Sequence, residues 1–445
     1  MSKVARTPFR PHLYAGTIVQ SGGIASDRTL LYRWTGTHWS PIDEDEAERH
    51  AYHWLVAENL NWASAENARK AFRAACLFAP SIPPLTREVV IPTENGYIHL
   101  VRNALEMHAA NPDLGLTHCL GCRYDPAGNV PHAFLRFLER VLPDESVRHR
   151  VQEYVGYTLL ADARYQRAQF WLGQGANGKG VLANIVQALH GRIAAMSLDQ
   201  LAGFHLSVLV GASLVYVDEV PRKPIDEQRL KSMIAGERIA IDRKHRDPIS
   251  IHVRGKWLVL GNHLPAITDH SVGFWRRWDI VPFGVTIAER DRDPLLAQSI
   301  ITNELSGVLN WALEGLVRLQ SRGGFDPVMP LAMQSMLREA KADTNSVVSW
   351  VDDLGVELQT ACDTLKDRVF EDYRHWCAAN AMREVSVVHF WKRMNEHFKE
   401  LGESRIRVDG VQRRVCNVSL ATPAPKGFPA GGADWPVSTR SKGYR

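Results

Sequence analysis

The stretch QRAQFWLGQGANGKG at residues 166–180 reads as a strand, a glycine-rich loop and the start of a helix. The short, mostly apolar run at 168–172 predicts the strand. The sequence KGVLANIVQALH at 179–190 has the apolar spacing of a helix, which Gly191 ends. Strand, loop and helix in this order are the context in which a phosphate-binding loop occurs.

The loop has the glycine and lysine spacing of a nucleoside triphosphate site. Gly173, Gly178 and Lys179 follow the G-x-x-x-x-G-K pattern. In this pattern backbone N–H groups surround the phosphates, and the lysine ammonium contacts the β- and γ-phosphate oxygens. The flanking strand and helix favour this interpretation over a chance match in a loop. We therefore expect ATP to contact Gly173, Gln174, Gly175, Ala176, Asn177, Gly178, Lys179, Gly180 and Val181.

The residue after the lysine departs from the pattern, because Gly180 stands where a serine or threonine would bind Mg²⁺. The metal must then depend on a carboxylate elsewhere. The apolar run at 213–217 predicts a buried strand, and Asp218 and Glu219 follow it directly. We expect Asp218 to bind the metal and Glu219 to polarise the attacking water. The competing interpretation is a pair of surface acids after a buried strand.

Composition predicts a soluble, globular chain of several domains. Its 445 residues are 45% hydrophobic and 23% charged, with a net charge of +4 and no apolar stretch of membrane-spanning length. The N-terminus lacks the apolar segment of a secretory signal, so we expect a cytoplasmic protein with no membrane partner. Six cysteines are too few for a disulfide framework. The group His118, Cys119 and Cys122 is half of a possible zinc site, but plain thiols are favoured because no second ligand pair has metal spacing.

The chain is expected to contain five regions. Hairpins around Gly36 and around Asn95-Gly96, the second with a type I′ turn, indicate an α+β domain over residues 1–130, with helices between 45 and 78. The later regions are a helical pair over 131–160, an ATPase core over 161–330, a C-terminal domain over 345–420 and a flexible basic tail over 421–445.

Further elements of the core follow the acid pair. The pattern predicts a short helix at 226–235 and a hairpin at 239–253 with a basic tip. A strand at 256–260 ends at Gly261-Asn262, and a long helix covers 295–320.

The order of these motifs resembles the superfamily-3 helicases, specifically the poxvirus and satellite-phage type of primase-helicase. After the loop come VYVDEV at 215–220, LKSMIAGERIAIDRKHRDP at 230–248 and LVLGNHLPAITDHSVGFWRRW at 258–278. The resemblance implies an α/β fold with a P-loop AAA+-type ATPase core, a small α+β N-terminal domain and a C-terminal winged helix. It also implies a hexameric ring that uses ATP and Mg²⁺ to unwind DNA.

The resemblance assigns two further catalytic roles. Asn262 matches the sensor asparagine that orients the hydrolytic water, and its alternative is an ordinary turn after a strand. Arg277 matches the arginine finger that one subunit projects into the site of its neighbour. We prefer Arg277 to Arg276 because it directly precedes Trp278 and the following apolar strand.

Two basic regions are candidates for binding single-stranded and duplex DNA. The hairpin at 239–253 is similar to a hairpin that these rings point into their channel, and a basic surface turn is the alternative. In the C-terminal domain, a helix after Ser386 and a hairpin with Arg405 and Arg407 would hold duplex DNA, and protein docking is the alternative. The expected DNA contacts are Arg243, Lys244, His245, Lys392, Arg393, Arg413 and Arg414.

The sequence thus predicts an ATP-dependent DNA helicase that serves replication of a phage, plasmid or integrated element. The residues before 131 are too few for a primase domain and lack a recognisable acidic triad, so a separate primase or host replication proteins are the expected partners. One alternative is an origin-binding initiator that remodels DNA without processive unwinding. Another is a weakly hydrolysing recruitment platform, since Gly180 weakens the expected metal site.

Overall fold

The computed structural model describes residues 8–221, 225–243, 246–265, 267, 272–360, 362–380, 382, 384–408 and 410–420. The chain divides into two compact units, Met1–Met336 and Leu337–Arg445. Lys244, His245 and the expected tail over 421–445 lie outside the described residues. Within the described part of the chain, no helix is long and apolar enough to cross a bilayer.

A five-stranded parallel sheet forms the centre of the first unit. Its middle strands are apolar runs because both of their faces are buried. The strands predicted at 168–172, 213–217 and 256–260 are all present. Across the sheet the order is β13 (Trp278–Pro282), β7 (Ala168–Leu172), β12 (Lys256–Gly261), β9 (Leu214–Val217) and β8 (Ile193–Ala195).

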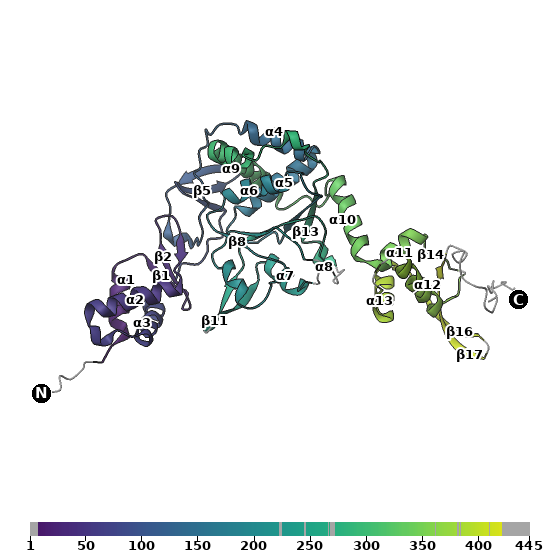
Figure 1. Ribbon diagram of the computed structural model, residues 1–445, viewed down its shortest axis with the longest axis horizontal. Helices are drawn as coiled ribbons and strands as arrows, with labels where there is room; N and C mark the ends of the chain where they lie inside the picture. Colours follow the sequence, from purple (N-terminus) through teal and green to yellow (C-terminus); the bar gives the residue numbers. More distant parts are fainter. Residues whose placement is uncertain are drawn as a thin grey trace. The chain divides into compact units, whose positions relative to one another are not determined.

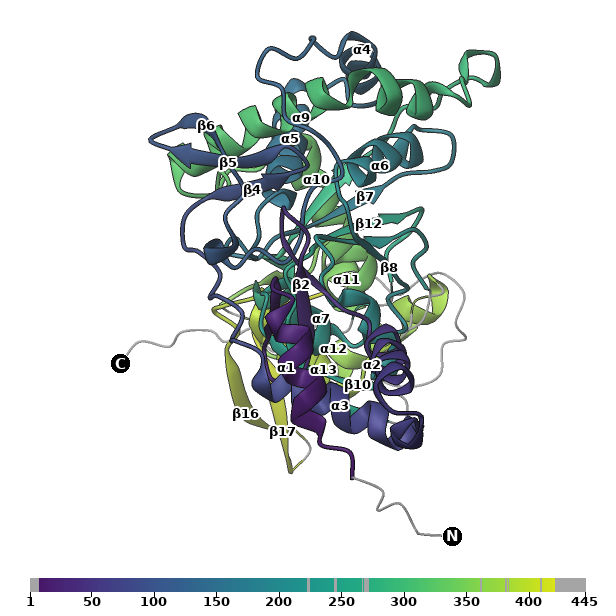
Figure 2. The ribbon, with the colours of Figure 1, turned by 90° about the vertical axis from the view of Figure 1, so that its left-hand side faces the viewer.

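Helices cover one side of this sheet (Figures 1 and 2). The helices at 145–158 and 296–322 approach each other closely. A Cβ on Gly156 of the first would lie only 2.6 Å from the backbone nitrogen of Leu316 on the second, so glycine permits this approach. The long helix ends where Gly323 adopts a left-handed φ of 79°. The helices predicted over 131–160 and 295–320 are confirmed as α4 (His132–Val141), α5 (Glu145–Thr158) and α9 (Leu296–Arg322), and α6 (Lys179–Ala188) lies beside them.

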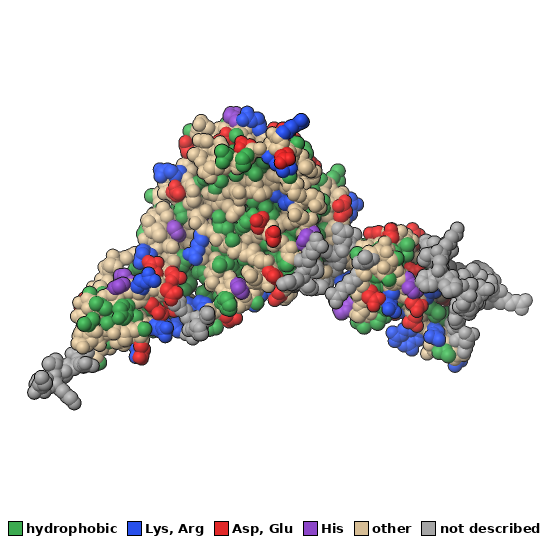
Figure 3. Space-filling model, viewed as in Figure 1, with side chains coloured by type: hydrophobic (Ala, Val, Ile, Leu, Met, Phe, Trp, Pro, Cys, Tyr) green, Lys and Arg blue, Asp and Glu red, His purple; other side chains and the backbone are tan. Residues whose placement is uncertain are grey.

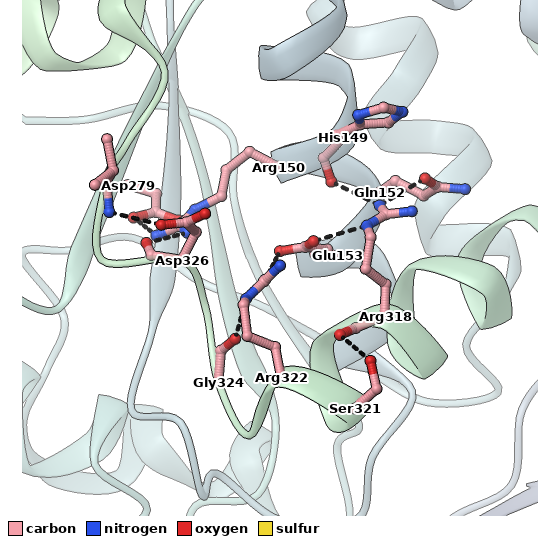
Figure 4. A network of polar contacts seen from close by, with 11 residues as sticks. His149, Arg150, Gln152, Glu153, Asp279, Arg318, Ser321, Arg322, Gly324 and Asp326 are labelled. Carbon is pink, nitrogen blue, oxygen red and sulfur yellow. Dashed lines mark hydrogen bonds and ion pairs between the residues drawn. The ribbon is translucent and has the colours of Figure 1, made fainter. Parts of the chain in front are cut away.

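Charged side chains tie α5 to β13 and to α9 (Figure 4). Arg150 on α5 donates to both carboxylate oxygens of Asp279 on β13, at 2.6 and 3.0 Å, and both side chains are buried. Glu153 accepts from Arg318 and Arg322 of α9, at 2.8 and 2.6 Å. Removing Asp279 would leave the buried Arg150 charge without its carboxylate, at a cost of about 3–5 kcal/mol, whereas removing Arg150 would leave Asp279 with Arg167 at 3.3 Å.

The N-terminal part of the first unit confirms both predicted hairpins but corrects one turn. Strands pair around Gly36 and around Asn95-Gly96 as expected. The type I′ turn expected at Asn95-Gly96 is wrong, because Asn95 is not left-handed. Two consecutive left-handed residues instead lie at Arg102 and Asn103, with φ of 48° and 68°, where they join the second strand of that hairpin to a third strand that was not predicted. The elements are α1 (Pro11–Gln20), β1 (Ile24–Ser26), β2 (Leu31–Trp34), β3 (Trp39–Pro41), α2 (Glu44–Glu58), α3 (Ala65–Phe78), β4 (Val90–Thr93), β5 (Gly96–Val101) and β6 (Ala104–His108).

The predicted basic hairpin lies on the other side of the sheet from α4, α5, α6 and α9 (Figures 1 and 2). It consists of β10 (Arg238–Arg243) and β11 (Arg246–His252), which are antiparallel and follow α7 (Glu227–Ile234). Helix α7 confirms the prediction at 226–235. The short elements of this unit are η1 (Leu60–Trp62), η2 (Pro112–Leu114), η3 (Gly203–Leu209), α8 (Val272–Trp275) and η4 (Glu289–Asp291).

The second unit contains helices and two small antiparallel sheets. Trp350 and Tyr373 are fully buried and pack edge to face with ring centroids 6.0 Å apart. Ser386 caps a helix through a bond from the backbone nitrogen of His389, as expected. Helix α10 (Leu331–Thr344) spans the division between the units. The other elements are α11 (Ser346–Leu354), β14 (Glu357–Leu358), β15 (Thr364–Leu365), α12 (Lys366–Ala379), α13 (Val387–His397), β16 (Glu403–Val408), β17 (Val411–Cys416) and β18 (Val418–Ser419).

Candidate nucleotide site and nucleic-acid surfaces

The glycine-rich loop lies at the carboxyl end of β7, against the ends of two neighbouring strands. The N–H of Gly173 donates to the carbonyl of Gly261 at the end of β12, at 3.2 Å. On the other side, the N–H of Phe283 donates to the carbonyl of Leu172, at 2.8 Å. A Cβ on Gly173 would lie 2.6 Å from the Asn177 Nδ2 atom, so this position has no space for a side chain.

Two left-handed residues curve the loop. Ala176 has φ of 59° and Gly178 has φ of 83°. A Cβ on Gly178 would also lie 2.6 Å from the Cγ1 atom of Val141 on α4, so glycine is required there for two independent reasons. The loop then enters α6 with Gly178 at its N-cap, and the backbone N–H groups of the first turn after Lys179 remain for a ligand.

Asn177 braces the loop from inside, a role that the sequence analysis missed. Its side-chain nitrogen donates to the carbonyls of Gln174 and Phe283, the second at 3.3 Å. Its side-chain oxygen accepts from the backbone nitrogen of Lys179, at 3.3 Å. The loop shape is therefore held by a residue at one of the variable positions of the motif, which spacing alone does not identify.

Lys179 and Asn262 meet in the structure although 83 residues separate them. The Lys179 Nζ atom donates to the Asn262 Oδ1 atom at 3.2 Å, and also to the carbonyl of Gly173. The lysine is 7% exposed, and this burial lowers the pKa of its ammonium, while the Asp218 carboxylate acts in the opposite direction. The sequence predicted that Lys179, Asn262 and Asp218 belong to one site. In the fold, Lys179 contacts Asn262 and is close enough to Asp218 for an electrostatic interaction.

Asp218 and Glu219 leave β9 at the same edge of the sheet. Strand β9 pairs with β12 in parallel, with Val217 opposite Val259, so both strands end near the loop. Both carboxylates are exposed, and the Asp218 Oδ1 atom accepts from the Tyr216 hydroxyl at 3.0 Å. Burial and the neighbouring Asp218 charge raise the pKa of Tyr216, which keeps it a neutral donor.

The residues present fit a magnesium ion that is held mainly by water and phosphate. In the described part of the chain no three His, Cys, Asp or Glu side chains gather as a protein-only metal site. Mg²⁺ usually takes one or two carboxylates and completes its shell with water and phosphate oxygens, and Asp218 can supply such a carboxylate. A Cβ on Gly180 would have no atom within 4 Å, so the local fold leaves open the position of the missing hydroxyl.

Arg277 lies at the opposite edge of the sheet. Its carbonyl accepts from the N–H of Ala168, where β7 begins, whereas the loop follows the end of β7. Five strand residues at about 3.3 Å each separate the two edges by roughly 15 Å. The guanidinium donates to the carbonyl of Gly273, and its Nε atom has no partner among the described residues. Arg277 therefore cannot reach the loop of its own chain, and its role as a finger in a neighbouring subunit stays a prediction.

Among the expected DNA contacts, two arginines already have partners within the fold. Arg243 forms an ion pair with Glu44 of α2, with both side chains largely buried. Arg393 donates to the side-chain oxygen of Asn345 at 3.3 Å, and burial lowers its pKa. Lys392 is exposed on α13.

The hairpin β16–β17 presents a dense basic surface in the second unit (Figure 3). Arg405 lies directly opposite Arg414, and Ile406 lies opposite Arg413. Arg407, two residues from Arg405, lies on the same face as Arg405 and Arg414 because side chains alternate along a strand. Like charges directly opposite each other destabilise a ladder, so this arrangement suits a surface that binds a polyanion.

Cys119 and Cys122 are free thiols, with Cys122 buried and Cys119 half-buried. Burial raises the pKa of Cys119 to about 11 and that of Cys122 to about 12, so both stay protonated thiols near neutral pH. The Cys122 thiol donates to the carbonyl of Leu189 at 3.8 Å.

Two protein families match parts of the chain. Residues 23–143 match the family described as D5 N terminal like. Residues 171–277, which run from the predicted loop strand to Arg277, match a family of unknown function, DUF5906.

One curated relative and several solved structures are also similar. A protein of Acanthamoeba polyphaga mimivirus, named as a candidate helicase, is 24% identical over 186 residues, which is 39% of this chain and 19% of that protein. The chain thus spans about a fifth of the length of this relative. A structure of the NrS-1 C-terminal region matches with a TM-score of 0.53 and 12% identity over 92% of this chain and 100% of that chain. A second structure of that region matches with a TM-score of 0.51 and 12% identity, over 92% of this chain and 99% of that chain. The structural match shows a shared fold, and all the matches together support a relation to the D5-like primase-helicases.

Proposed function

We propose that this chain is an ATP-driven DNA helicase of the superfamily-3 type, which works as a ring in the replication of a virus, phage, plasmid or integrated element. The observation that carries the proposal is the contact between Lys179 and Asn262 at the carboxyl edge of a parallel sheet. Ligands of open α/β sheets bind at this edge. A viral relative that is named as a candidate helicase supports the same function.

In this proposal the loop and Lys179 hold the triphosphate, and Asp218 holds the magnesium ion. The N–H groups of the curved loop and of the first turn of α6 face the phosphates, and the Lys179 ammonium neutralises the β- and γ-phosphate charge. Lys179 now donates to Asn262 and to loop carbonyls, so binding requires only that the ammonium turn from these acceptors to phosphate oxygens. Mg²⁺ supplies positive charge between the phosphates when it is bound.

Glu219 and Asn262 act on the attacking water. The Glu219 carboxylate accepts a proton as the water oxygen approaches the γ-phosphorus, and the bond from that phosphorus to the bridging oxygen breaks. The Asn262 side chain stays neutral and orients the water through hydrogen bonds. Its position at the end of β12, beside Lys179, fits this role.

Arg277 completes the site of a neighbouring subunit. Because the sheet separates it from its own loop, any contribution to hydrolysis must be made in trans. A guanidinium that contacts phosphate oxygens stabilises charge in the transition state more than in the bound substrate. Arg276, which is exposed at the adjacent position, is the second candidate.

DNA would contact the hairpin β10–β11 and the second unit. In the second unit, α11, α12 and α13 with the sheet β15-β17-β16 support a winged-helix domain whose wing is β16–β17. The arginines of that wing contact phosphates and carry little sequence information. A separate primase or host replication proteins would complete the replication machinery.

The proposal is tested by separating ATP binding from ATP hydrolysis in two variants. Lys179→Ala should lose turnover because the phosphates lose their fixed cation. Glu219→Gln should bind ATP but hydrolyse it at least a hundredfold more slowly, since it keeps the shape and loses the base. Lys70→Ala, an exposed lysine paired with Glu66 on α3, is the matched control and should keep full activity.

Near-normal turnover in Lys179→Ala would refute the nucleotide site. The finger is tested by mixing Arg277→Ala with Lys179→Ala protein under conditions where subunits exchange. The mixture should regain activity, because one type of interface then joins an intact loop to an intact finger. A mixture that exchanges subunits and stays inactive would exclude Arg277 as a finger.

A further inference from the structure

A cavity of about 260 Å³ lies at the base of the β10–β11 hairpin, away from the nucleotide loop. It is lined by Arg238 from the start of β10, His252 from the end of β11, and Arg254 just beyond it. Arg254 precedes β12 by two residues, whereas the loop lies beyond the other end of that six-residue strand. At about 3.3 Å per residue the two sites are roughly 15–20 Å apart.

Basic groups converge on this cavity. Arg238 and His252 are direct partners across the antiparallel ladder, so their Cβ atoms lie within about 5.5 Å of each other. Arg254 donates to the Thr117 hydroxyl at 3.0 Å. No ion pair joins Arg238 or Arg254 to another described residue. Arg254 is half-buried beside a neutral hydroxyl, and burial lowers its pKa, so an anionic ligand would stabilise its charge.

The acid in the cavity wall does not neutralise these arginines. Asp27 accepts hydrogen bonds from the backbone of Thr29 and Leu30 and from the Thr29 hydroxyl, at 2.6 to 2.9 Å. Its second oxygen accepts from the Tyr32 hydroxyl at 3.0 Å. The carboxylate is therefore engaged by its own loop.

A buried polar atom without a partner also belongs to the cavity wall. His118 is 4% exposed, and its Nε2 atom has no hydrogen-bond partner among the described residues. A buried unsatisfied nitrogen costs about 1–3 kcal/mol, so such atoms commonly mark a position where a ligand or water supplies the missing bond.

We propose that this cavity binds a phosphate group through Arg238, Arg254 and His252. Two planar guanidinium groups suit the tetrahedral oxygens of phosphate, to which arginine binds in a bidentate manner. The volume accommodates one phosphate with part of a sugar. The phosphate comes either from a polynucleotide backbone or from a free nucleotide or inorganic phosphate. Because the cavity is formed by the base of the hairpin, its ligand holds the hairpin to the N-terminal segment that carries Asp27 and, on β2, Tyr32.

The experiment uses the full chain with Lys179→Ala, so that the nucleotide loop does not contribute phosphate binding. Two probes are titrated. Binding of inorganic phosphate is measured by its effect on the thermal unfolding temperature, and binding of a labelled 20-nucleotide oligothymidine is measured by fluorescence anisotropy. Arg238→Ala is the main variant because this side chain is exposed and its loss leaves the core intact. Arg254→Gln is the second. Arg136→Ala on α4 is the control, since it removes the same charge from an exposed helix outside the cavity.

We expect Arg238→Ala to weaken binding of at least one probe tenfold or more relative to Arg136→Ala. A backbone ligand predicts weaker oligothymidine binding and a salt slope smaller by about one. A free phosphate ligand predicts loss of stabilisation by inorganic phosphate with unchanged oligothymidine binding. If both probes bind Arg238→Ala and Arg136→Ala equally, the proposal is wrong. This test does not depend on ATP turnover. The cavity proposal can therefore fail while the proposed helicase function stands, and the helicase function can fail while the cavity still binds phosphate.

Discussion

A buried lysine at the start of a strand of the central sheet makes the stability of the first unit depend on pH above neutrality. Lys256 begins β12, is 2% exposed, and its Nζ atom donates to the carbonyls of Leu160 and Arg254. Its ammonium also lies 5.4 Å from the centroid of the Tyr157 ring. Burial lowers the pKa of Lys256 from 10.5 to about 7, against a smaller opposing effect of Asp162.

The sign of the effect follows from the two pKa values. Below pH 7 the lysine is protonated in both the folded and the unfolded chain, so the cost of burying its charge is fully present. As pH rises from about 7 toward 10.5, the folded chain releases its proton before the unfolded chain does, and the free energy of unfolding increases. Each pH unit in this window contributes at most about 1.4 kcal/mol.

The measurement compares the wild type with Lys256→Met. The free energy of unfolding from urea titrations should rise by about 2–3 kcal/mol more in the wild type than in the variant between pH 7.5 and 9.5. The carbonyls left without a donor in the variant cost the same at each pH, so they cancel in this difference. Lys70→Met, at an exposed lysine, should follow the wild type. A difference between the wild type and Lys256→Met that stays constant over this range would refute the reasoning.

Three further predictions concern the loop, the metal and the hairpin. Gly178→Ala should abolish ATP binding, because it combines a left-handed φ of 83° with a clash against α4. Gly16→Ala on α1, where a Cβ meets no atom within 4 Å, should bind normally in a fluorescent-nucleotide titration. Gly180→Ser should lower the Mg²⁺ concentration for half-maximal ATP turnover, and an unchanged or higher requirement would show that water already replaces the hydroxyl. Glu44→Gln should release Arg243 and tighten binding of single-stranded DNA severalfold, with a steeper salt dependence, and weaker binding would show that the ion pair only supports the hairpin.

The sequence predicted the central sheet except for the short edge strand β8, because the pattern of each longer strand is local. The run at 168–172 is apolar along its whole length, as a strand buried on both faces requires, and Gly178 and Lys179 stand at fixed offsets from it. The motif order placed Lys179 and Asn262 in one site, and their direct contact emerges only in the structure. Its physical cause is the parallel pairing of β7 and β12, which brings both strand ends to one edge.

Other features could not be derived from local patterns. The bracing role of Asn177 depends on Phe283, which lies 106 residues further along the chain. The left-handed turn at Arg102 and Asn103 has no glycine, and Asn103 alone is a weaker turn signal than the Asn95-Gly96 pair nearby. The ion pair between Arg243 and Glu44 joins residues 199 positions apart, and charge patterning within the hairpin indicated only an exposed basic tip.

The most direct test of the central claim is strand displacement driven by ATP. The wild type is incubated with Mg²⁺, ATP and a forked DNA whose duplex is longer than the footprint of the assembled protein, and release of the labelled strand is followed beside ATP turnover. The account predicts displacement by the wild type and none by Glu219→Gln, which should still bind ATP and DNA. DNA-stimulated hydrolysis by the wild type without displacement of that strand would contradict a helicase and favour an initiator that remodels DNA locally.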